Sequence, residues 1–386
     1  MREATTGSSR WTARAGVGLL AVLALLAGAC GDDDGDDTGA SGTGAPTETT
    51  GPGGTSGEGL PDEAQPLDER VSLTVGYLPS LSVAVLGAAQ GLGYFDEENL
   101  DVSLSVIQSS QDANVLLAQG EFDVITGSMS AGFFNSIDRG LAVKAVGTPS
   151  TIGAVSGADT PAPSGVFVRK ELADSGEITD YADMAGRRVA SVGGVGASAS
   201  YLVGLYAEAG GLTLKDVELV NLGIADSLTG LQQGSVDLAF LTSPFSQQAL
   251  DSGAAVELGS ARDIYGDETQ SAFIMGPNLL EDNRQAAVAF MRALLRAAAD
   301  MQGDYRSNDA LVQAVSETYE IPVESIQNAP PYAVPADLAQ QPETATRMQE
   351  MFLEYGGLLD YDEPMPIDRV IDDEIRQLAE QSLAGS

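Results

Sequence analysis

Two parts of the 386-residue sequence repeat one another in the same order and at a nearly constant spacing. QGEFDV begins at Gln119 and is echoed by QGSVDL from Gln233, 114 residues later. Around this match, DVSL returns as DVEL after 115 residues, and DRG returns as DSG after 113 residues. Matches that keep both order and spacing indicate two lobes of one design, although generic similarity between two α/β segments is the alternative.

The first copy alternates strand-like and helix-like runs. The patterns predict strands at residues 71–75, 102–107 and 124–125, and helices at residues 81–90 and 114–119. This β-α-β order is typical of a mainly parallel sheet covered by helices. Right-handed crossovers place the carboxyl ends of such strands along one edge, where ligands bind in open α/β sheets. Two lobes of this kind therefore predict a cleft between facing edges.

The N-terminus has the pattern of an exported lipoprotein. Three arginines precede an apolar run over residues 16–27, which has the length of a signal-peptide core and is too short to span a bilayer. LAGAC ends this run at Cys30 and resembles the lipobox of bacterial lipoproteins, although Ala27 stands where that pattern more often has Leu. We expect a signal peptide over residues 1–29 and lipid on Cys30. An ordinary signal peptide with an incidental cysteine is the alternative.

An acidic stretch follows. Residues 30–69 contain 11 acids and no Lys or Arg among many Gly, Ser, Thr and Pro residues, which is the composition of a flexible tether. The whole chain has a formal charge of -37, and this disfavours nucleic acid and anionic lipid as partners. We therefore expect no nucleic-acid partner, and membrane contact only through lipid on Cys30.

Two residue types restrict the chemistry. Histidine is absent and Cys30 is the only cysteine. Ser-His-Asp catalysis, Cys-His catalysis and His-ligated zinc sites are therefore excluded. With Cys30 assigned to lipid, an intrachain disulfide is excluded as well. We expect no cofactor, no metal and no enzymatic activity.

The segment SVGGVGASAS, residues 191–200, contains the letter pattern G-x-G-x-x-A. In a dinucleotide site, this turn binds the pyrophosphate and an acid at the end of the next strand binds ribose. Here the next strand, residues 217–222, ends in Asn-Leu. Gly194 and Gly196 therefore predict a turn whose backbone approaches a different ligand. Ser198 would either donate to that ligand or cap the following helix.

Six ordered motifs resemble the nitrate/sulfonate/taurine type of ABC-transporter solute-binding protein: VGYLPS, GYFDEENLDV, QGEFDV, DMAGRRVASV, GLTLKDVELV and LQQGSVDLAFLTSPF. The likeness is strong over residues 71–250 and loose in the C-terminal part. It implies the type II periplasmic-binding-protein fold, an α/β architecture in which each of two lobes is a mainly parallel sheet flanked by helices. It further implies lobe 1 over residues 71–173 and 270–386, lobe 2 over residues 174–262, and hinge or crossover regions at residues 165–173 and 262–275.

Five loops at strand ends are predicted to line the cleft: residues 77–82, 126–132, 193–200, 224–227 and 242–245. None of them contains Lys, Arg or His. Asp226 is their one charge and would complement an amino group, whereas capping a helix that begins at Ser227 is the alternative. Met129 and Phe133 would equally suit core packing. Arg262, beyond the last strand of lobe 2, could reach inward. The predicted ligand-binding residues are Tyr77, Pro79, Ser80, Ser128, Met129, Ser130, Gly194, Gly196, Ser198, Asp226, Thr242, Ser243 and Phe245.

The resemblance implies a monomeric, lipid-anchored protein on the extracytoplasmic face of the membrane. It would capture a small organic solute, sulfonate/taurine-like or aminopyrimidine-like, and deliver it to an ABC permease and its ATPase. The missing basic residue weakens a simple nitrate or sulfonate assignment. A sensor or partner-binding lipoprotein of the same fold is the alternative. Enzymes of this fold are disfavoured, because thiamin-pyrimidine synthases use a histidine and porphobilinogen-deaminase-like enzymes need an internal cysteine.

Overall fold

The computed structural model describes residues 65–107, 110–153, 155 and 160–384. The chain divides into two units, Met1–Gly54 and Thr55–Ser386, and all described residues belong to the second. The expected signal peptide, Cys30 and most of the expected tether lie outside the described residues. Among the described residues, no helix combines the length and the apolar character needed to cross a bilayer.

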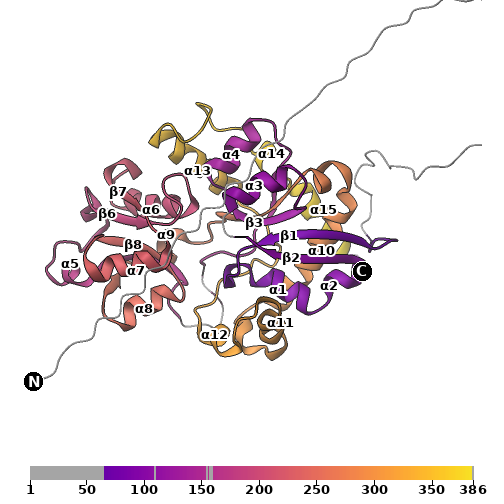
Figure 1. Ribbon diagram of the computed structural model, residues 1–386, viewed down its shortest axis with the longest axis horizontal. Helices are drawn as coiled ribbons and strands as arrows, with labels where there is room; N and C mark the ends of the chain where they lie inside the picture. Colours follow the sequence, from indigo (N-terminus) through magenta and orange to yellow (C-terminus); the bar gives the residue numbers. More distant parts are fainter. Residues whose placement is uncertain (1–64, 108–109, 154, 156–159, 385–386) are drawn as a thin grey trace, which may run out of the picture. The chain divides into compact units, whose positions relative to one another are not determined.

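Two five-stranded sheets organise the described part of the chain (Figure 1). In each, three neighbouring strands run parallel and the fourth runs antiparallel to them. The first sheet has the order β2 (Leu100–Val106), β1 (Val71–Tyr77), β3 (Val124–Ser128), β10 (Ser271–Met275) and β4 (Lys144–Gly147). The second has the order β7 (Glu218–Asn221), β6 (Arg188–Ser191), β8 (Leu238–Thr242), β5 (Ser164–Arg169) and β9 (Ala255–Glu257).

The first and third parallel strands pair in equivalent register in the two sheets. Val75 pairs with Val124 in the first sheet, and Val189 pairs with Leu238 in the second, so both partners move by 114 residues. This is the offset of the QGEFDV repeat. The repeat therefore marks equivalent β-α-β units, and the expected two-lobe α/β fold is confirmed.

The repeated aspartate explains the motif. Asp123 accepts a 2.7 Å hydrogen bond from the N–H of Thr74 in β1, and Asp237 accepts one of 3.1 Å from the N–H of Arg188 in β6. Arg188 also reaches Asp237 with its guanidinium at 3.2 Å, and Arg169 does so at 3.4 Å. In each lobe the aspartate thus fixes the first parallel strand to the third.

Replacing Asp237 by Asn tests this role. Partial burial raises the pKa of Asp237, but the hydrogen bonds and charge of Arg188, together with Arg169, outweigh it and hold the pKa below its usual range. A lowered pKa in the folded state stabilises the fold above about pH 4 and loses that effect as the pH falls through the folded pKa. We expect Asp237→Asn to cost about 1–2 kcal/mol at neutral pH and less at about pH 3, measured by urea unfolding. An equal cost at both pH values would contradict this role, and exposed Asp362→Asn is the control.

Each face of the first sheet packs against its own helices because side chains alternate along a strand. Val124 and Phe273 lie in one core cluster and their neighbours Ile125 and Ile274 lie in another. The first cluster includes α1 (Ala84–Gly91), α10 (Arg284–Asp300), α11 (Asp309–Tyr319) and α15 (Asp373–Ala384), and the second includes α3 (Ser110–Ala118) and α4 (Ala131–Asp138).

The second sheet is covered in the same way. Val166 and Leu238 face α6 (Ser198–Ala209), whereas Phe167 and Ala239 face α7 (Ile224–Gln233) and α8 (Phe245–Asp251). Shorter helices fill the periphery: α2 (Tyr94–Glu97), α5 (Lys170–Asp174), α9 (Ala261–Tyr265), α12 (Val323–Asn328) and α14 (Ile367–Val370).

Helix α13 (Pro342–Tyr355) contacts both lobes. Phe352 packs edge-on against Phe134 of α4, with 6.4 Å between ring centroids. On the other side Met351 lies against Gly204 of α6, where a Cβ would be only 2.3 Å from the Met351 sulfur. Arg347 forms an ion pair with Glu208 of α6. The C-terminal region therefore joins the lobes through one continuous core.

Strand β5 departs from the expected organisation. Residues 71–173 are expected in lobe 1, with a hinge or crossover region at residues 165–173, but β5 pairs with β8 and β9 in the second sheet. Both faces of its apolar run are buried there, Val166 and Val168 on one face and Phe167 on the other. The chain has therefore entered the second sheet by Ser164, and it returns to the first sheet at Ser271.

Candidate ligand-binding site

Hydroxyl groups connect the loops at the carboxyl ends of β1 and β3. Oγ1 of Thr126 in β3 accepts a 3.3 Å hydrogen bond from the backbone N–H of Leu78, the residue after β1. Oγ of Ser80 accepts from the N–H and the hydroxyl of Ser82, at 3.3 and 3.1 Å. The Ser82 carbonyl accepts a 2.6 Å hydrogen bond from Ser150. Ser150 lies in the segment that connects β4 to β5, which is the first crossover between the sheets. The loop after β1 therefore lies beside strand β3 and beside Ser150.

The glycine loop reaches the other lobe. The carbonyl of Gly196 accepts a 2.8 Å hydrogen bond from the N–H of Ala131, and its own N–H donates to Oγ of Ser200 at 3.0 Å. The φ of Gly196 is +87°, and a Cβ there would lie 3.0 Å from the Cβ of Ala131. Gly194 has a φ of +70° and lies beside Asn221 at the end of β7. Gly196 therefore closely approaches the loop after β3, while the approach of this glycine loop to a ligand stays a prediction.

Strand-end hydroxyl residues lie beside the crossovers between the sheets. Ser128 pairs with the first residue of β10, and Thr242 pairs with the first residue of β5. The N–H of Ser243 donates a 2.8 Å hydrogen bond to the carbonyl of Pro163, the residue before β5. All three residues are half-buried. They therefore lie where each sheet meets a crossover.

Ser130 and Ser198 lie at helix starts. Ser130 is the N-cap of α4, and its Oγ accepts from the N–H of Phe133 at 3.3 Å. Ser198 is the first residue of α6 and is half-buried. The hydroxyl of Ser130 thus has a structural partner, while no hydrogen bond engages the Ser198 side chain within the described residues.

Asp226 does not cap a helix. Helix α7 begins at Ile224 with Gly223 as its N-cap, three residues earlier than the start expected at Ser227. The capping alternative is therefore wrong. Asp226 lies exposed in the first turn of α7, where the helix dipole favours a negative charge.

The apolar candidates differ in burial. Tyr77 is buried and stacks on Tyr319, with 4.9 Å between ring centroids. Met129 and Phe133 are fully buried core residues, as the packing alternative expects. Phe245 is half-buried against the core beneath α8. Pro79 is exposed.

Arg262 binds the backbone of the first crossover. Its Nη1 donates to the carbonyls of Ile152, at 3.0 Å, and Gly153. Its Nη2 donates to the carbonyls of Thr160 and Pro161, at 3.2 and 3.1 Å. Burial lowers the pKa of this guanidinium. The basic residue expected to reach inward is thus bound to backbone carbonyls.

Two polar residues that the sequence reasoning missed lie near the candidate loops. Ser191 ends β6 and is completely buried, and its Oγ has no hydrogen-bond partner in the described structure. Gln270, just before β10, has an unpartnered buried Oε1, while its carbonyl accepts from the N–H of Met129 at 3.0 Å. Ser191 is the first residue of the segment SVGGVGASAS, and its place at the carboxyl end of a strand is the signal that could have identified it.

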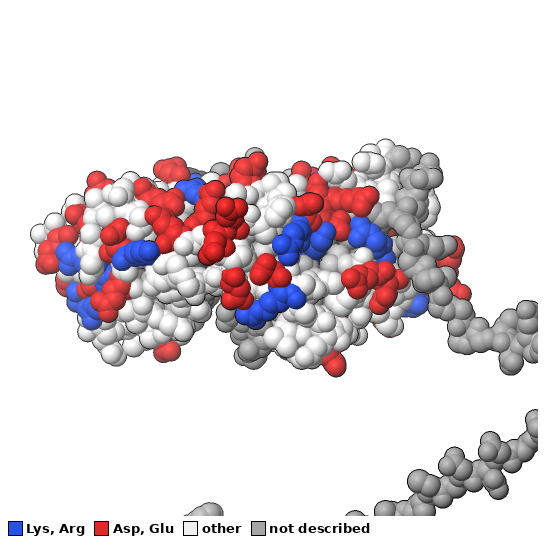
Figure 2. Space-filling model, turned by 90° about the horizontal axis from the view of Figure 1, so that it is seen from above, with Lys and Arg blue, Asp and Glu red and all other residues white. Residues whose placement is uncertain are grey.

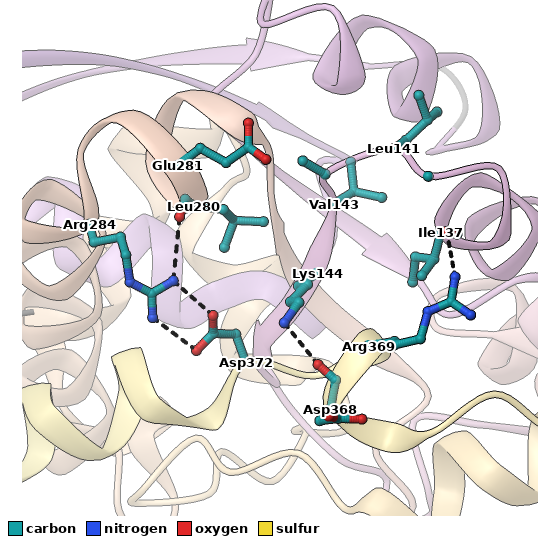
Figure 3. Close-up of a pocket in the computed structure, with 12 residues that line it drawn as sticks. Ile137, Leu141, Val143, Lys144, Leu280, Glu281, Arg284, Asp368, Arg369 and Asp372 are labelled. Atoms are coloured by element: carbon teal, nitrogen blue, oxygen red, sulfur yellow. Dashed lines mark hydrogen bonds and ion pairs between the residues drawn. The ribbon is translucent and has the colours of Figure 1, made fainter. Parts of the chain in front are cut away.

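A pocket of about 510 Å³ lies at the edge strand β4 (Figure 3). Apolar residues form part of its wall, and Lys144, Arg284 and Arg369 point toward it from three elements. A second pocket of about 480 Å³ adjoins it and shares Lys144. No group of three or more acidic or thiol side chains in the described residues is arranged to hold a metal.

The chain matches one protein-family model, described as NMT1/THI5 like, over residues 81–304. This range covers more than half of the sequence. A search of curated proteins found no match.

Many solved structures share the fold. The alkanesulfonate-binding protein SsuA from Xanthomonas axonopodis pv. citri, bound to MOPS, is 17% identical over 79% of this chain and 99% of its own, with a TM-score of 0.59. The periplasmic nitrate-binding protein NrtA from Synechocystis PCC 6803 is 16% identical over 82% of this chain and 90% of its own, with a TM-score of 0.62. The desulfurization enzyme DSZB is 19% identical over 81% of this chain and 99% of its own, with a TM-score of 0.54. These likenesses agree with the type II periplasmic-binding-protein fold.

Proposed function

We propose, from the premise that the chain belongs to the NMT1/THI5-like family, that it binds a small organic solute between its two lobes and delivers it to an ABC permease. The observation that carries this proposal is the contact of strand-end loops from both sheets. The loop after β3 meets the glycine loop after β6 through the hydrogen bond from Ala131 to Gly196. Carboxyl ends of parallel strands are where open α/β sheets bind ligands.

The composition of these loops suggests the solute class. They contain no Lys, Arg or His, and Arg262 is bound to four backbone carbonyls. A solute held there would be bound by hydroxyls, helix-start N–H groups and apolar side chains. Asp226 favours a solute that carries an amino group or another N–H donor. Within the sulfonate/taurine-like and aminopyrimidine-like classes, we therefore propose a solute that carries an amino group.

The proposed cellular setting rests on the lipobox-like segment that ends at Cys30. Lipid on Cys30 would anchor the protein on the extracytoplasmic face, and residues 30–69 would connect the anchor to the lobes. A permease and its ATPase would then be the partners, and a monomer would suffice. Bound solute would favour a closed state only through contacts with both lobes.

Two other functions are alternatives to this proposal. A sensor or partner-binding lipoprotein would use the same loops without a permease. An enzyme is the other case, because one solved structure with this fold is a desulfurization enzyme. We propose a non-enzymatic role, since the chain has no histidine and Cys30 as its only cysteine.

The test is thermal unfolding of the full chain with taurine, alkanesulfonates, nitrate and aminopyrimidines, joined to native mass spectrometry for retained solute. One compound should raise the melting temperature, because a ligand at 100 times its Kd stabilises the folded state by about 2.7 kcal/mol. Asp226→Asn should weaken the response to an amino compound at least about tenfold, whereas exposed Asp362→Asn should not. No bound solute and no shift with any compound would favour the partner-binding alternative.

A further inference from the structure

The pocket at β4 lies at the opposite edge of the first sheet from the solute loops. Met275 ends β10 and pairs with both Lys144 and Val124, the first residues of β4 and β3. Lys144 therefore lies at the amino end of β3, whereas the candidate loops follow its carboxyl end. The pocket is lined by Ile137, Gly140, Leu141, Ala142, Val143, Lys144, Leu280, Glu281, Arg284, Asp368, Arg369 and Asp372. It is thus a separate site.

Two cations in this pocket lack carboxylate partners. The ammonium of Lys144 donates to the backbone carbonyl of Asp368 at 2.8 Å, and the guanidinium of Arg369 donates to the carbonyl of Ile137 at 3.1 Å (Figure 3). Among the basic residues that the structure describes, those without a carboxylate ion pair are Lys144, Lys215, Arg262 and Arg369.

This arrangement is unusual for so acidic a chain. Acidic residues outnumber basic ones by 56 to 19, and Figure 2 shows acidic side chains beside most basic ones on the face it presents. Lys144 and Arg369 therefore lie in one pocket without carboxylate partners, so an anion from solution could pair with both. Both side chains retain free N–H donors, because each donates one hydrogen bond, to a backbone carbonyl, within the described residues.

The third cation, Arg284, and the acidic side chains of the pocket limit the charge of the ligand. Arg284 is paired with Asp372 at 3.0 Å and with Glu374 at 3.1 Å, so it is neutralised. Glu281 and Asp368 also line the pocket, and both residues are exposed. They would repel a dianion such as sulfate or phosphate more strongly than a single negative charge.

The walls favour an apolar body. Ile137, Val143 and Leu280 present buried aliphatic side chains, and Leu141 is 41% exposed to solvent. A volume of about 510 Å³ is in the range of small-molecule sites. Since a planar carboxylate matches the guanidinium fork of Arg369, we infer that this pocket binds a small organic monocarboxylate with an aliphatic chain, at a site independent of the proposed solute cleft.

The experiment uses hexanoate as the probe and isothermal titration calorimetry on the full chain. Saturable binding at one site is expected, with weaker binding of hexan-1-ol and of sulfate. Lys144→Met and Arg369→Gln should each weaken hexanoate binding at least about tenfold, because each removes a charge-assisted hydrogen bond. Leu141→Ser should weaken it by about threefold through lost apolar contact.

Matched control variants outside the pocket test whether the loss of hexanoate binding is specific to the pocket residues. Lys215→Met removes an unpaired lysine elsewhere, and Leu116→Ser removes another exposed leucine, so neither should change hexanoate affinity. Circular dichroism melts establish that each variant is folded, and exposed Arg369 provides a second variant if Lys144→Met destabilises the fold. The inference is overturned if hexanoate does not bind saturably below about 10 mM. It is also overturned if Lys144→Met and Arg369→Gln, both folded, bind hexanoate as the parent does.

Discussion

Replacing Glu98 by Gln should lower the free energy of unfolding by about 3–5 kcal/mol, because it leaves a buried guanidinium without its counter-charge. Glu98 is 1% exposed and Arg292 is 6% exposed, and their Oε2 and Nε atoms lie 2.9 Å apart. Arg292 also donates to Oγ of Ser382 in α15 at 2.5 Å. The pair therefore lies inside the core where α10, α15 and the segment before β2 meet. Chemical unfolding at neutral pH measures the effect.

A neighbouring ion pair provides the control for Glu98. Glu97 pairs with Arg296 at 2.5 Å, but Glu97 is 57% exposed, and surface pairs contribute about 1 kcal/mol or less. Glu97→Gln should therefore change stability little. The double variant Glu98→Leu with Arg292→Leu should recover part of the loss, because it removes both charges. A loss below about 1 kcal/mol for Glu98→Gln would show that the buried charge has another compensation.

The two-lobe fold was predictable because its main signal is local and repeated. The motif around Asp123 and Asp237 recurs since the same aspartate fixes the same pair of strands in each lobe. The strand expected at residues 71–75 is Val71–Tyr77, and the one expected at residues 102–107 is Leu100–Val106. Alternation and turn residues near in sequence determine these elements.

Strand β5 could not be assigned in the same way. Its run from Gly165 to Val168 is apolar on both faces and would suit an inner position in either sheet. Its actual place depends on pairing with Phe240 and Val256, which lie about 75 to 90 residues further on. Periodicity predicts a strand here but carries no information on its partner.

The candidate site was predictable only as a set of loops. Strand order brings the loops of Ser80, Thr126 and Gly196 to their sheet edges, but not the partners of each side chain. Gly196 is bound to Ala131 of the other lobe, and the hydroxyl of Ser130 is used in a cap. These contacts depend on how the two lobes pack against each other, and a local sequence pattern cannot predict that packing. The Lys144 pocket was missed because it lies at the amino ends of strands.

Replacing Arg262 by Met should disrupt the connection between the lobes. The guanidinium is the shared donor of four carbonyls in the first crossover, at Ile152, Gly153, Thr160 and Pro161. Since hydrogen bonds to a charged group contribute about 1.5–3 kcal/mol, we expect a loss of at least about 2 kcal/mol in stability. Solute affinity should fall as well, because lobe closure depends on the crossovers.

Two variants of Arg262 distinguish the effect of its hydrogen-bonding geometry from the effect of its positive charge. Arg262→Lys keeps the positive charge but cannot reach four carbonyls from one ammonium, so it should lose most of the same stability. Arg139→Met removes an exposed arginine paired with Asp360 at 2.6 Å and should have little effect. If Arg262→Lys behaved as the parent while Arg262→Met did not, charge alone would explain the role. Burial lowers the pKa of Arg262, and the nearby Glu257 partly opposes this by favouring the charged form. If both variants unfold as the parent does, the crossover is held by its other contacts, among them the paired backbone of Thr151 and Ala333.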